Sequence, residues 1–208
     1  MTTVAVIDYG MGNLRSVCKA IERVAPEARV RLATCAADIE RADRIVFPGQ
    51  GAIGGCIAAL ERSGMGDALR ASLDSKPYLG ICLGLQALYE SSEEGGGSVC
   101  LGLLPGRVRR FDAAGGLKVP HMGWNQVYQT RPHPLWRGIA PETRFYFVHS
   151  YYAETTDAGL VVGATEYGVR FTSAAARANI FAVQFHPEKS QQAGLRLLAN
   201  FVAWDGSV

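Results

Sequence analysis

The sequence lacks long apolar runs and any large excess of charge. Its formal net charge is only +2, and its basic residues form no stripe interleaved with aromatic residues, which argues against a nucleic-acid partner. No apolar stretch approaches the length of a membrane span, and the N-terminal residues carry no basic start followed by the long apolar core of a secretory signal. We therefore expect a cytoplasmic protein that contacts no membrane.

Cysteine is also sparse, and the cysteines are widely separated in the sequence. The five residues are Cys18, Cys35, Cys56, Cys82 and Cys100. An odd number at wide spacing, without a C-x-x-C pair, argues against both a disulfide framework and a zinc site. We expect no metal, no cofactor and a reducing compartment, in which one of these thiols could remain reactive.

What the sequence does contain is the alternation of strands and helices that is typical of an α/β protein. With 208 residues, of which 48% are hydrophobic and 19% are charged, the chain suits one globular domain spanning 1–208. Strands are expected near residues 4–8, 29–33, 44–47 and 78–81, and helices near 14–24, 36–41, 53–60 and 67–73. This order predicts a mostly parallel central sheet flanked by helices.

Short strands separated by turns follow from about residue 95 to residue 173. They are expected at 107–110, 125–128, 144–148, 160–162 and 168–171, and no linker separates them from the first half of the chain. We interpret them as an antiparallel extension of the same sheet. One more strand at 180–185 and a final helix from about Ser190 complete the predicted fold.

The strand at 78–81 leads into the most informative segment, because a helical pattern with Leu85, Leu88 and Tyr89 begins directly after it. Cys82 stands at this change, and glycines lie two residues away on either side. The layout is that of a nucleophile elbow, G-x-S-x-G, with sulfur in place of oxygen. The glycines are expected because the turn is tight and because strand and helix approach each other too closely for side chains.

The elbow would expose the Cys82 thiol at the start of a helix, where unpaired N–H groups and the helix dipole favour the nucleophilic thiolate. The backbone N–H of Leu83 would then donate into an oxyanion hole. The competing interpretation is that Cys82 is a small buried apolar residue, as most free cysteines are.

Among the four histidines, His186 is the best candidate for a catalytic base. It ends the strand at 180–185, at the sheet edge where Cys82 should also lie, and Glu188 follows two residues later. A carboxylate there can hold the imidazole in one tautomer and stabilise its charged form. Cys82, His186 and Glu188 thus form a candidate triad. His133, between two prolines, is expected in a solvated loop, and the roles of His121 and His149 stay open.

Six sequence blocks now resemble a known family, the triad-type (class I) glutamine amidotransferases, and within it the glutaminase subunits of imidazole glycerol phosphate synthase in histidine biosynthesis. The blocks lie at residues 8–17, 47–52, 80–86, 119–125, 147–151 and 184–190. The elbow and the H-P-E triplet are shared by the whole class, whereas D-Y-G-M-G-N, P-H-M-G-W-N and H-P-E-K-S are the specific blocks. Gln50 is a departure, because many relatives carry valine there. The resemblance implies a flavodoxin-like fold.

The resemblance also implies an activity, the hydrolysis of L-glutamine by Cys82, His186 and Glu188. Ammonia would pass to a (β/α)8-barrel cyclase subunit that makes imidazole glycerol phosphate and aminoimidazole carboxamide ribotide, so the enzyme would be a heterodimer combining hydrolase and lyase activities. The residues implied to form the oxyanion hole are Leu83, Gly49 and Gln50, and those implied to hold the substrate are Gly49, Gly51, Gln86, His149, Ser150 and Tyr151.

Two further expectations concern the partner. Met122, Trp124, Tyr146 and Lys189 should share a rim beside the site, and an exposed cluster of this kind is typical of an interface core. The Gly49–Gln50 peptide can turn over at little steric cost because glycines flank it. We expect that in the free chain its N–H does not point to the oxyanion position, and that a loaded cyclase reverses this.

Three alternatives remain. The chain could be the glutaminase subunit of another synthase, of the anthranilate or aminodeoxychorismate type, although those relatives lack two of the specific blocks. It could be a non-catalytic domain that kept the fold, or a cysteine hydrolase acting on peptides.

Overall fold

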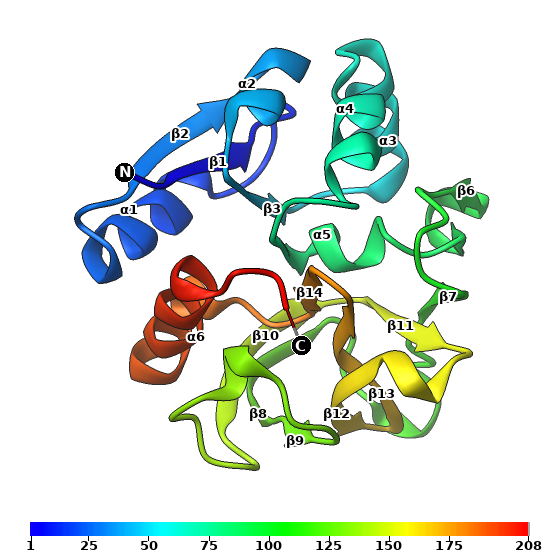
Figure 1. Ribbon diagram of the computed structural model, residues 1–208. Coiled ribbons are helices and arrows are strands. Elements are labelled where there is room, and N and C mark those ends of the chain that lie inside the picture. Colours follow the sequence, from blue (N-terminus) through cyan, green and yellow to red (C-terminus); the bar gives the residue numbers. More distant parts are fainter. Residues whose placement is uncertain (208) are drawn as a thin grey trace.

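A 12-stranded sheet runs through the described part of the chain, residues 1–207 of the computed structural model (Figure 1). Its first five neighbouring strands are parallel and follow the order β2-β1-β3-β4-β14. Their bounds are β1 Thr3–Ile7, β2 Arg29–Ala33, β3 Arg44–Gly49, β4 Tyr78–Cys82 and β14 Ile180–Val183. The expected α/β fold with a mostly parallel central sheet is therefore confirmed. The carboxyl ends of β3, β4 and β14 lie together at one edge, where such sheets bind ligands.

Helices cover both faces of the parallel strands because successive residues of each strand point to opposite faces. In β1, Val4 and Val6 belong to one buried cluster, and Ala5 and Ile7 to another. The first cluster includes α1 and α6, and the second includes α2, α3 and α4. The helix bounds are α1 Leu14–Val24, α2 Ala36–Arg41, α3 Ile53–Arg62, α4 Met65–Ser72, α5 Leu83–Gln86 and α6 Gln191–Ala203.

The antiparallel strands continue this sheet beyond β14, in the order β13, β11, β7, with β12 attached to β13. Short strands β5, β6 and β9 complete it. The bounds are β5 Ser91–Ser92, β6 Ser98–Val99, β7 Gly106–Arg110, β9 Tyr128–Gln129, β11 Tyr151–Thr155, β12 Val161–Tyr167 and β13 Val169–Arg177. The extension was predicted, but β11, which connects β7 to β13, was not.

The prediction of one continuous sheet is wrong for β8 (His121–Gln126) and β10 (Arg144–His149), which pair with each other as a separate two-stranded sheet. The reason is packing. Phe145 and Phe147 alternate toward the cluster that also contains α6, and Phe145 stacks on Phe185 with ring centroids 4.0 Å apart. The pair therefore lies over one face of the main sheet instead of lengthening it, and the strand expected at 125–128 breaks at Val127.

Two local expectations also fail. The helix after Cys82 ends at Gln86, because the N–H groups of Leu88 and Tyr89 bond to the carbonyls three residues earlier and tighten the chain into turns. His133 is not in a solvated loop but is only 7% exposed. Its ring packs against Phe181 and Trp204, and its Nδ1 accepts the Leu135 N–H at 3.1 Å, so these contacts hold the ring inside the fold.

The elbow itself is built as predicted. Cys82 has φ +55°, an uncommon value for a residue with a side chain. A Cβ on Gly84 would stand 1.8 Å from the carbonyl oxygen of Phe47, and one on Gly80 would stand 2.6 Å from that of Gly84. The buried Tyr78 hydroxyl donates to the Gly84 carbonyl at 2.9 Å and so helps to fix the turn.

Among residues 1–207, none of the helices combines the length and the apolar composition that a transmembrane span requires.

Replacing Gly84 by alanine should destabilise the fold by roughly 3 kcal/mol or more, because the new methyl group meets backbone that cannot move aside. Urea unfolding of the variant measures this loss. Gly55 is the matched control: it lies exposed in α3, and a Cβ there meets only Met11 Cε at 3.5 Å. Gly55→Ala should stabilise the protein by about 0.5–1 kcal/mol. Equal effects of the two changes would contradict this account of the elbow.

Candidate active site

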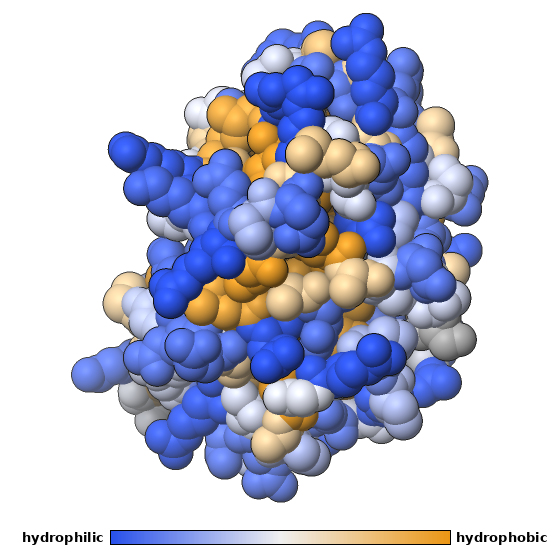
Figure 2. Space-filling model, turned by 60° about the vertical axis from the view of Figure 1, so that its left-hand side comes forward, coloured by the Kyte–Doolittle hydropathy of each residue, from blue (hydrophilic) through white to orange (hydrophobic). Residues whose placement is uncertain are grey.

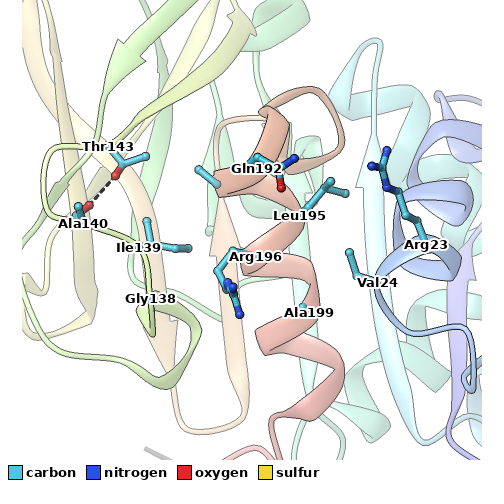
Figure 3. A pocket seen from close by; sticks show the side chains of 11 residues that line it. Arg23, Val24, Gly138, Ile139, Ala140, Thr143, Gln192, Leu195, Arg196 and Ala199 are labelled. Carbon is cyan, nitrogen blue, oxygen red and sulfur yellow. Dashed lines mark hydrogen bonds between the residues drawn. The ribbon is translucent and has the colours of Figure 1, made fainter.

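A groove beside α6 is not the site that the sequence predicts. Apolar residues form a band across the side of the molecule that carries α1 and α6 (Figure 2). A hollow of about 560 Å³ lies there, with α1 on one side of α6 and the loop around residue 139 on the other (Figure 3). Arg23 and Arg196 are its charged lining residues, and it holds no cysteine, histidine or carboxylate.

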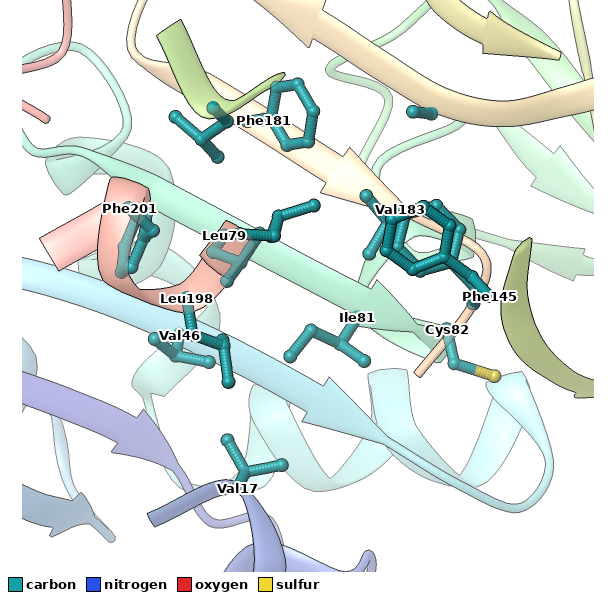
Figure 4. Packing of buried hydrophobic residues seen from close by; sticks show 14 of the residues in the cluster. Val17, Val46, Leu79, Ile81, Cys82, Phe145, Phe181, Val183, Leu198 and Phe201 are labelled. Atoms are coloured by element: carbon teal, nitrogen blue, oxygen red, sulfur yellow. The ribbon is translucent and has the colours of Figure 1, made fainter. Parts of the chain in front are cut away.

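A smaller cavity of about 340 Å³ lies at the carboxyl ends of β3 and β4, and Cys82 is one of the residues that line it. Figure 4 shows Cys82 at the very end of β4, beyond the packed side chains of the core. The lining residues are Gln50, Gly51, Cys82, Leu83, Gln86, Glu94, Pro120, Val148, His149, Ser150, Tyr151 and His186. Most residues predicted for the site thus share one cavity. Gly49 and Glu188 are not among its lining residues.

His186 reaches the cavity from the turn after β14. Its backbone N–H donates to the Tyr146 carbonyl at 2.9 Å, and its carbonyl accepts the Ser190 hydroxyl at 2.6 Å. Its Nδ1 lies 2.9 Å from Oε1 of Glu188, and the two side chains are only 3% and 1% exposed. Because Nδ1 faces a carboxylate, its proton stays there, and Nε2 is left as the reactive nitrogen.

Electrostatics favour a charged His186. Burial alone disfavours the imidazolium, but the negative charge of a Cys82 thiolate and the hydrogen bond to Glu188 outweigh it and raise the pKa of His186 to about 10. Among the described residues, Nε2 of His186 is buried without a hydrogen-bond partner, so it is available to a substrate. α5 has only four residues, so the helix dipole expected at Cys82 is that of a single short turn.

Two glutamines orient the sulfur, and one of them was missed from the sequence. Gln184, fully buried in the segment after β14, approaches Cys82 Sγ with its Nε2 at 3.6 Å. The Gln86 amide nitrogen donates to Gln184 Oε1 at 3.0 Å and to the Tyr151 carbonyl at 2.9 Å. These bonds define which atom is the oxygen and which the nitrogen in each side-chain amide, so each amide has a single orientation. The sequence does carry a signal for Gln184, since this residue lies two positions before His186 in the apolar run 180–185, which was predicted as a strand.

A buried histidine pair connects this network to β8. His149 Nδ1 lies 2.8 Å from the Tyr151 carbonyl and must carry a proton, so its Nε2 accepts from His121 Nδ1 at 2.9 Å. His121 Nε2 in turn accepts from Asn125 at 3.2 Å. Burial lowers the pKa of His121 to about 4 and that of His149 to about 3, which keeps both rings neutral. These hydrogen bonds determine the tautomers of both His121 and His149.

The Gln50 backbone does not present its N–H to the cavity. That N–H donates to the Tyr9 hydroxyl at 3.1 Å, and the same hydroxyl lies 3.1 Å from the Gln50 carbonyl oxygen. A Cβ on Gly49 would stand 2.6 Å from Leu83 Cβ and 2.8 Å from the Tyr9 oxygen. The strand end is therefore wedged between the elbow and Tyr9, and only a glycine fits there.

Glu94 is a cavity residue that sequence reasoning missed. Its Oε2 accepts the Ile53 N–H at 2.8 Å, so the carboxylate caps the start of α3 while facing the cavity. It lies in a glycine-rich loop after the elbow, and nothing in the local pattern separates it from the neighbouring acidic residues. Among residues 1–207, no group of three or more His, Cys, Asp or Glu side chains is arranged to hold a metal ion.

The four residues predicted for a partner surface lie together. Met122 and Trp124 are 62% and 44% exposed on β8. Trp124 meets the Tyr146 ring edge-on at a centroid distance of 6.1 Å, and Lys189 Nζ stands 5.9 Å from the centre of the same ring. Met122 pairs with Val148, a lining residue, so this surface adjoins the cavity.

Comparisons with known proteins agree with the sequence motifs. The chain matches the family model described as glutamine amidotransferase class-I over residues 5–204. It is 58% identical over 211 residues to the imidazole glycerol phosphate synthase subunit HisH of Aromatoleum aromaticum, covering 98% of this chain and 99% of that protein. It is also 58% identical over 207 residues to the subunit of the same name from Nitrosococcus oceani, covering 99% of both.

Solved structures share the fold at low sequence identity. PurLQS from Thermotoga maritima aligns with a TM-score of 0.77 and 17% identity, covering 97% of this chain and 98% of that one. A crystal structure of a glutamine amidotransferase aligns with a TM-score of 0.73 and 20% identity, covering 96% and 97%. These likenesses concern the architecture alone.

Acid should destabilise the protein through the buried histidine pair. With folded pKa values of about 4 and 3 against an ordinary 6.5, His121 and His149 stay neutral while the unfolded chain takes up protons. The free energy of unfolding therefore falls as the pH drops below 6.5 toward 4. Between about pH 7 and about pH 5, the free energy of unfolding of the parent should fall by roughly 1–2 kcal/mol more than that of His121→Gln. Urea unfolding at the two pH values measures both losses. An unchanged pH dependence would show that His121 is not buried as a neutral ring.

Proposed function

Because the chain belongs to the class I glutamine amidotransferases, in the branch of the imidazole glycerol phosphate synthase subunits HisH, we propose that Cys82, His186 and Glu188 hydrolyse L-glutamine to glutamate and ammonia. One observation carries the assignment. The thiol at a strained elbow and the imidazole of a buried His–Glu pair open into the same cavity of about 340 Å³.

The reaction starts with the Cys82 thiolate attacking the side-chain carboxamide of glutamine. His186 donates its Nε2 proton to the departing nitrogen, and ammonia leaves as a glutamyl thioester forms on Cys82. The neutral imidazole then takes a proton from water, the resulting hydroxide attacks the thioester, and glutamate is released. Glu188 holds the ring through Nδ1 and stabilises its charged form during both steps.

The remaining lining residues hold the amino-acid end of the substrate. Gly51, Gln86 and the segment 149–151 offer backbone and amide groups of fixed orientation. Glu94 is the one carboxylate on the cavity wall, so it is the natural partner of the substrate ammonium group. A charged, hydrogen-bonded amino-acid end is what distinguishes free glutamine from a glutamine within a peptide.

The active and resting forms in this proposal differ in the number of N–H groups that stabilise the oxyanion. The Leu83 N–H is one donor, and the Gln50 N–H, on the Gly49–Gln50 peptide, is the second. The Gln50 N–H donates to the Tyr9 hydroxyl, which supports a resting form without this second donor. Absence of one such donor costs roughly 10²–10³ in turnover. A partner that reverses the peptide would therefore switch glutamine hydrolysis on.

The partner in this proposal is a (β/α)8-barrel cyclase in the cytoplasm, which receives the ammonia and makes imidazole glycerol phosphate and aminoimidazole carboxamide ribotide. Residues 1–208 act as one amidotransferase domain with no cofactor. The cyclase binds the surface formed by Met122, Trp124, Tyr146 and Lys189. HisH relatives at 58% identity favour this pairing over the anthranilate or aminodeoxychorismate alternative.

Replacing Cys82 by alanine should abolish glutamine-dependent synthesis, by roughly 10⁴-fold or more, because no thioester can form. The complex should still make product from added ammonium salt, since the nucleophile serves only ammonia release. Both rates can be measured on the purified complex. Retained glutamine-driven turnover would refute the role of Cys82, and loss of the ammonia-driven rate as well would show that the variant damages the assembly.

Replacing Trp124 by alanine should weaken cyclase binding by roughly 30-fold or more, which corresponds to a loss of about 2 kcal/mol at an aromatic interface anchor. Titration calorimetry measures the affinity. Leu32→Ala is the matched control, because Leu32 is equally exposed, at 47%, but lies on the edge strand β2. The assignment of this surface fails if the two variants bind the cyclase equally well.

A further inference from the structure

Tyr9 does not act on the substrate in the proposed reaction, but its side chain contacts the oxyanion segment, which is the Gly49–Gln50 peptide. It follows β1, and β1 is the neighbour of β3 in the sheet. Its hydroxyl accepts the Gln50 N–H at 3.1 Å and donates to the Gln50 carbonyl at 3.1 Å. One side chain thereby engages both backbone polar groups of the same residue.

We propose that Tyr9 is a positioning residue that holds the Gly49–Gln50 peptide in its resting orientation. The inference rests on the proposed function, in which the Gln50 N–H is the second oxyanion donor. That N–H cannot serve an oxyanion while it donates to Tyr9. The hydroxyl of Tyr9 therefore sets how often the free subunit visits its active form.

The tyrosine is well placed to act as a rigid support. It is only 7% exposed, and its ring meets Phe47 edge-on with centroids 5.8 Å apart. Burial also raises its pKa well above the ordinary value, so the hydroxyl keeps its proton and can donate. Leu83 also packs against Gly49, where a Cβ would come within 2.6 Å of Leu83 Cβ and 2.8 Å of the Tyr9 oxygen. The Tyr9 hydroxyl and the elbow thus both pack closely against this strand end.

The two states differ in which groups the Gln50 backbone satisfies. In the resting state Tyr9 supplies the partners, and in the active state the N–H faces the cavity and gains a partner only when an oxyanion forms. Removing the hydroxyl takes stabilisation from the resting state alone. We expect the active population of the free subunit to rise about tenfold, which equals about 1.4 kcal/mol.

The test is Tyr9→Phe, which keeps the ring and its contact with Phe47 and removes only the hydroxyl. In the free subunit, kcat for glutamine hydrolysis should rise about tenfold while KM stays the same, because the peptide acts on the transition state. With a substrate-loaded cyclase, the variant should match the parent, so the factor of stimulation should fall about tenfold. An unchanged or lowered basal kcat would overturn the proposal.

Tyr89→Phe provides the matched control. Tyr89 is fully buried, and its hydroxyl bonds to Thr155 at 2.6 Å, away from the oxyanion segment. Both variants lose one buried hydroxyl, and urea unfolding shows whether their stabilities fall alike. A rise in basal kcat in Tyr89→Phe as well would mean that general loosening, not release of Gln50, explains the effect.

The proposal and the proposed function fail in different ways. If the parent complex makes no glutamate from glutamine, the proposed function is wrong. If the parent complex is active and its loaded cyclase stimulates it, but Tyr9→Phe has the basal kcat of the parent, then only the role of Tyr9 is wrong.

Discussion

The contact on which the site depends is the close approach of the Gly84 backbone to the Phe47 carbonyl. A Cβ at Gly84 would come within 1.8 Å of that oxygen, so the chain can turn from β4 into α5 only without a side chain there. The turn forces Cys82 to φ +55°, and the Tyr78 hydroxyl bonds the Gly84 carbonyl from the other side. The strain at Cys82 is maintained because the surrounding packing leaves no alternative.

Groups of different kinds then meet at the sulfur. His186 and Glu188 supply charge, and the two glutamines supply oriented dipoles without net charge. Burial disfavours a charged ring, but the negative charge of Cys82 and the hydrogen bond to Glu188 outweigh it and raise the pKa of His186 to about 10. The neutral network decides instead where the sulfur points, which is the property that a nucleophile at a fixed distance from its substrate needs.

The sequence predicted the elements that carry local signals and missed those decided by packing. The elbow and the alternation of strands and helices could be predicted because glycine spacing and apolar periodicity are local. The separate β8–β10 pair could not, since it depends on the contact of Phe145 with Phe185, 40 residues along the chain. Glu94 was missed because its function as a cap for Ile53 joins two distant loops. His133 was misjudged because prolines indicate a turn but not which way its side chains face.

The order of strands in the sheet has a consequence for how the molecule opens. β3, β4 and β14, which bring the site together, each have a hydrogen-bonded neighbour on both sides, whereas β2 and β6 are edge strands with exposed residues. Fraying therefore begins at the edges, and amide hydrogens should exchange there first. The cavity is left intact until the central strands separate, so partial unfolding at low cost releases the periphery while the thiol remains enclosed. The arrangement of Cys82 and His186 at the ends of β4 and β14 therefore persists after the edges of the sheet have opened.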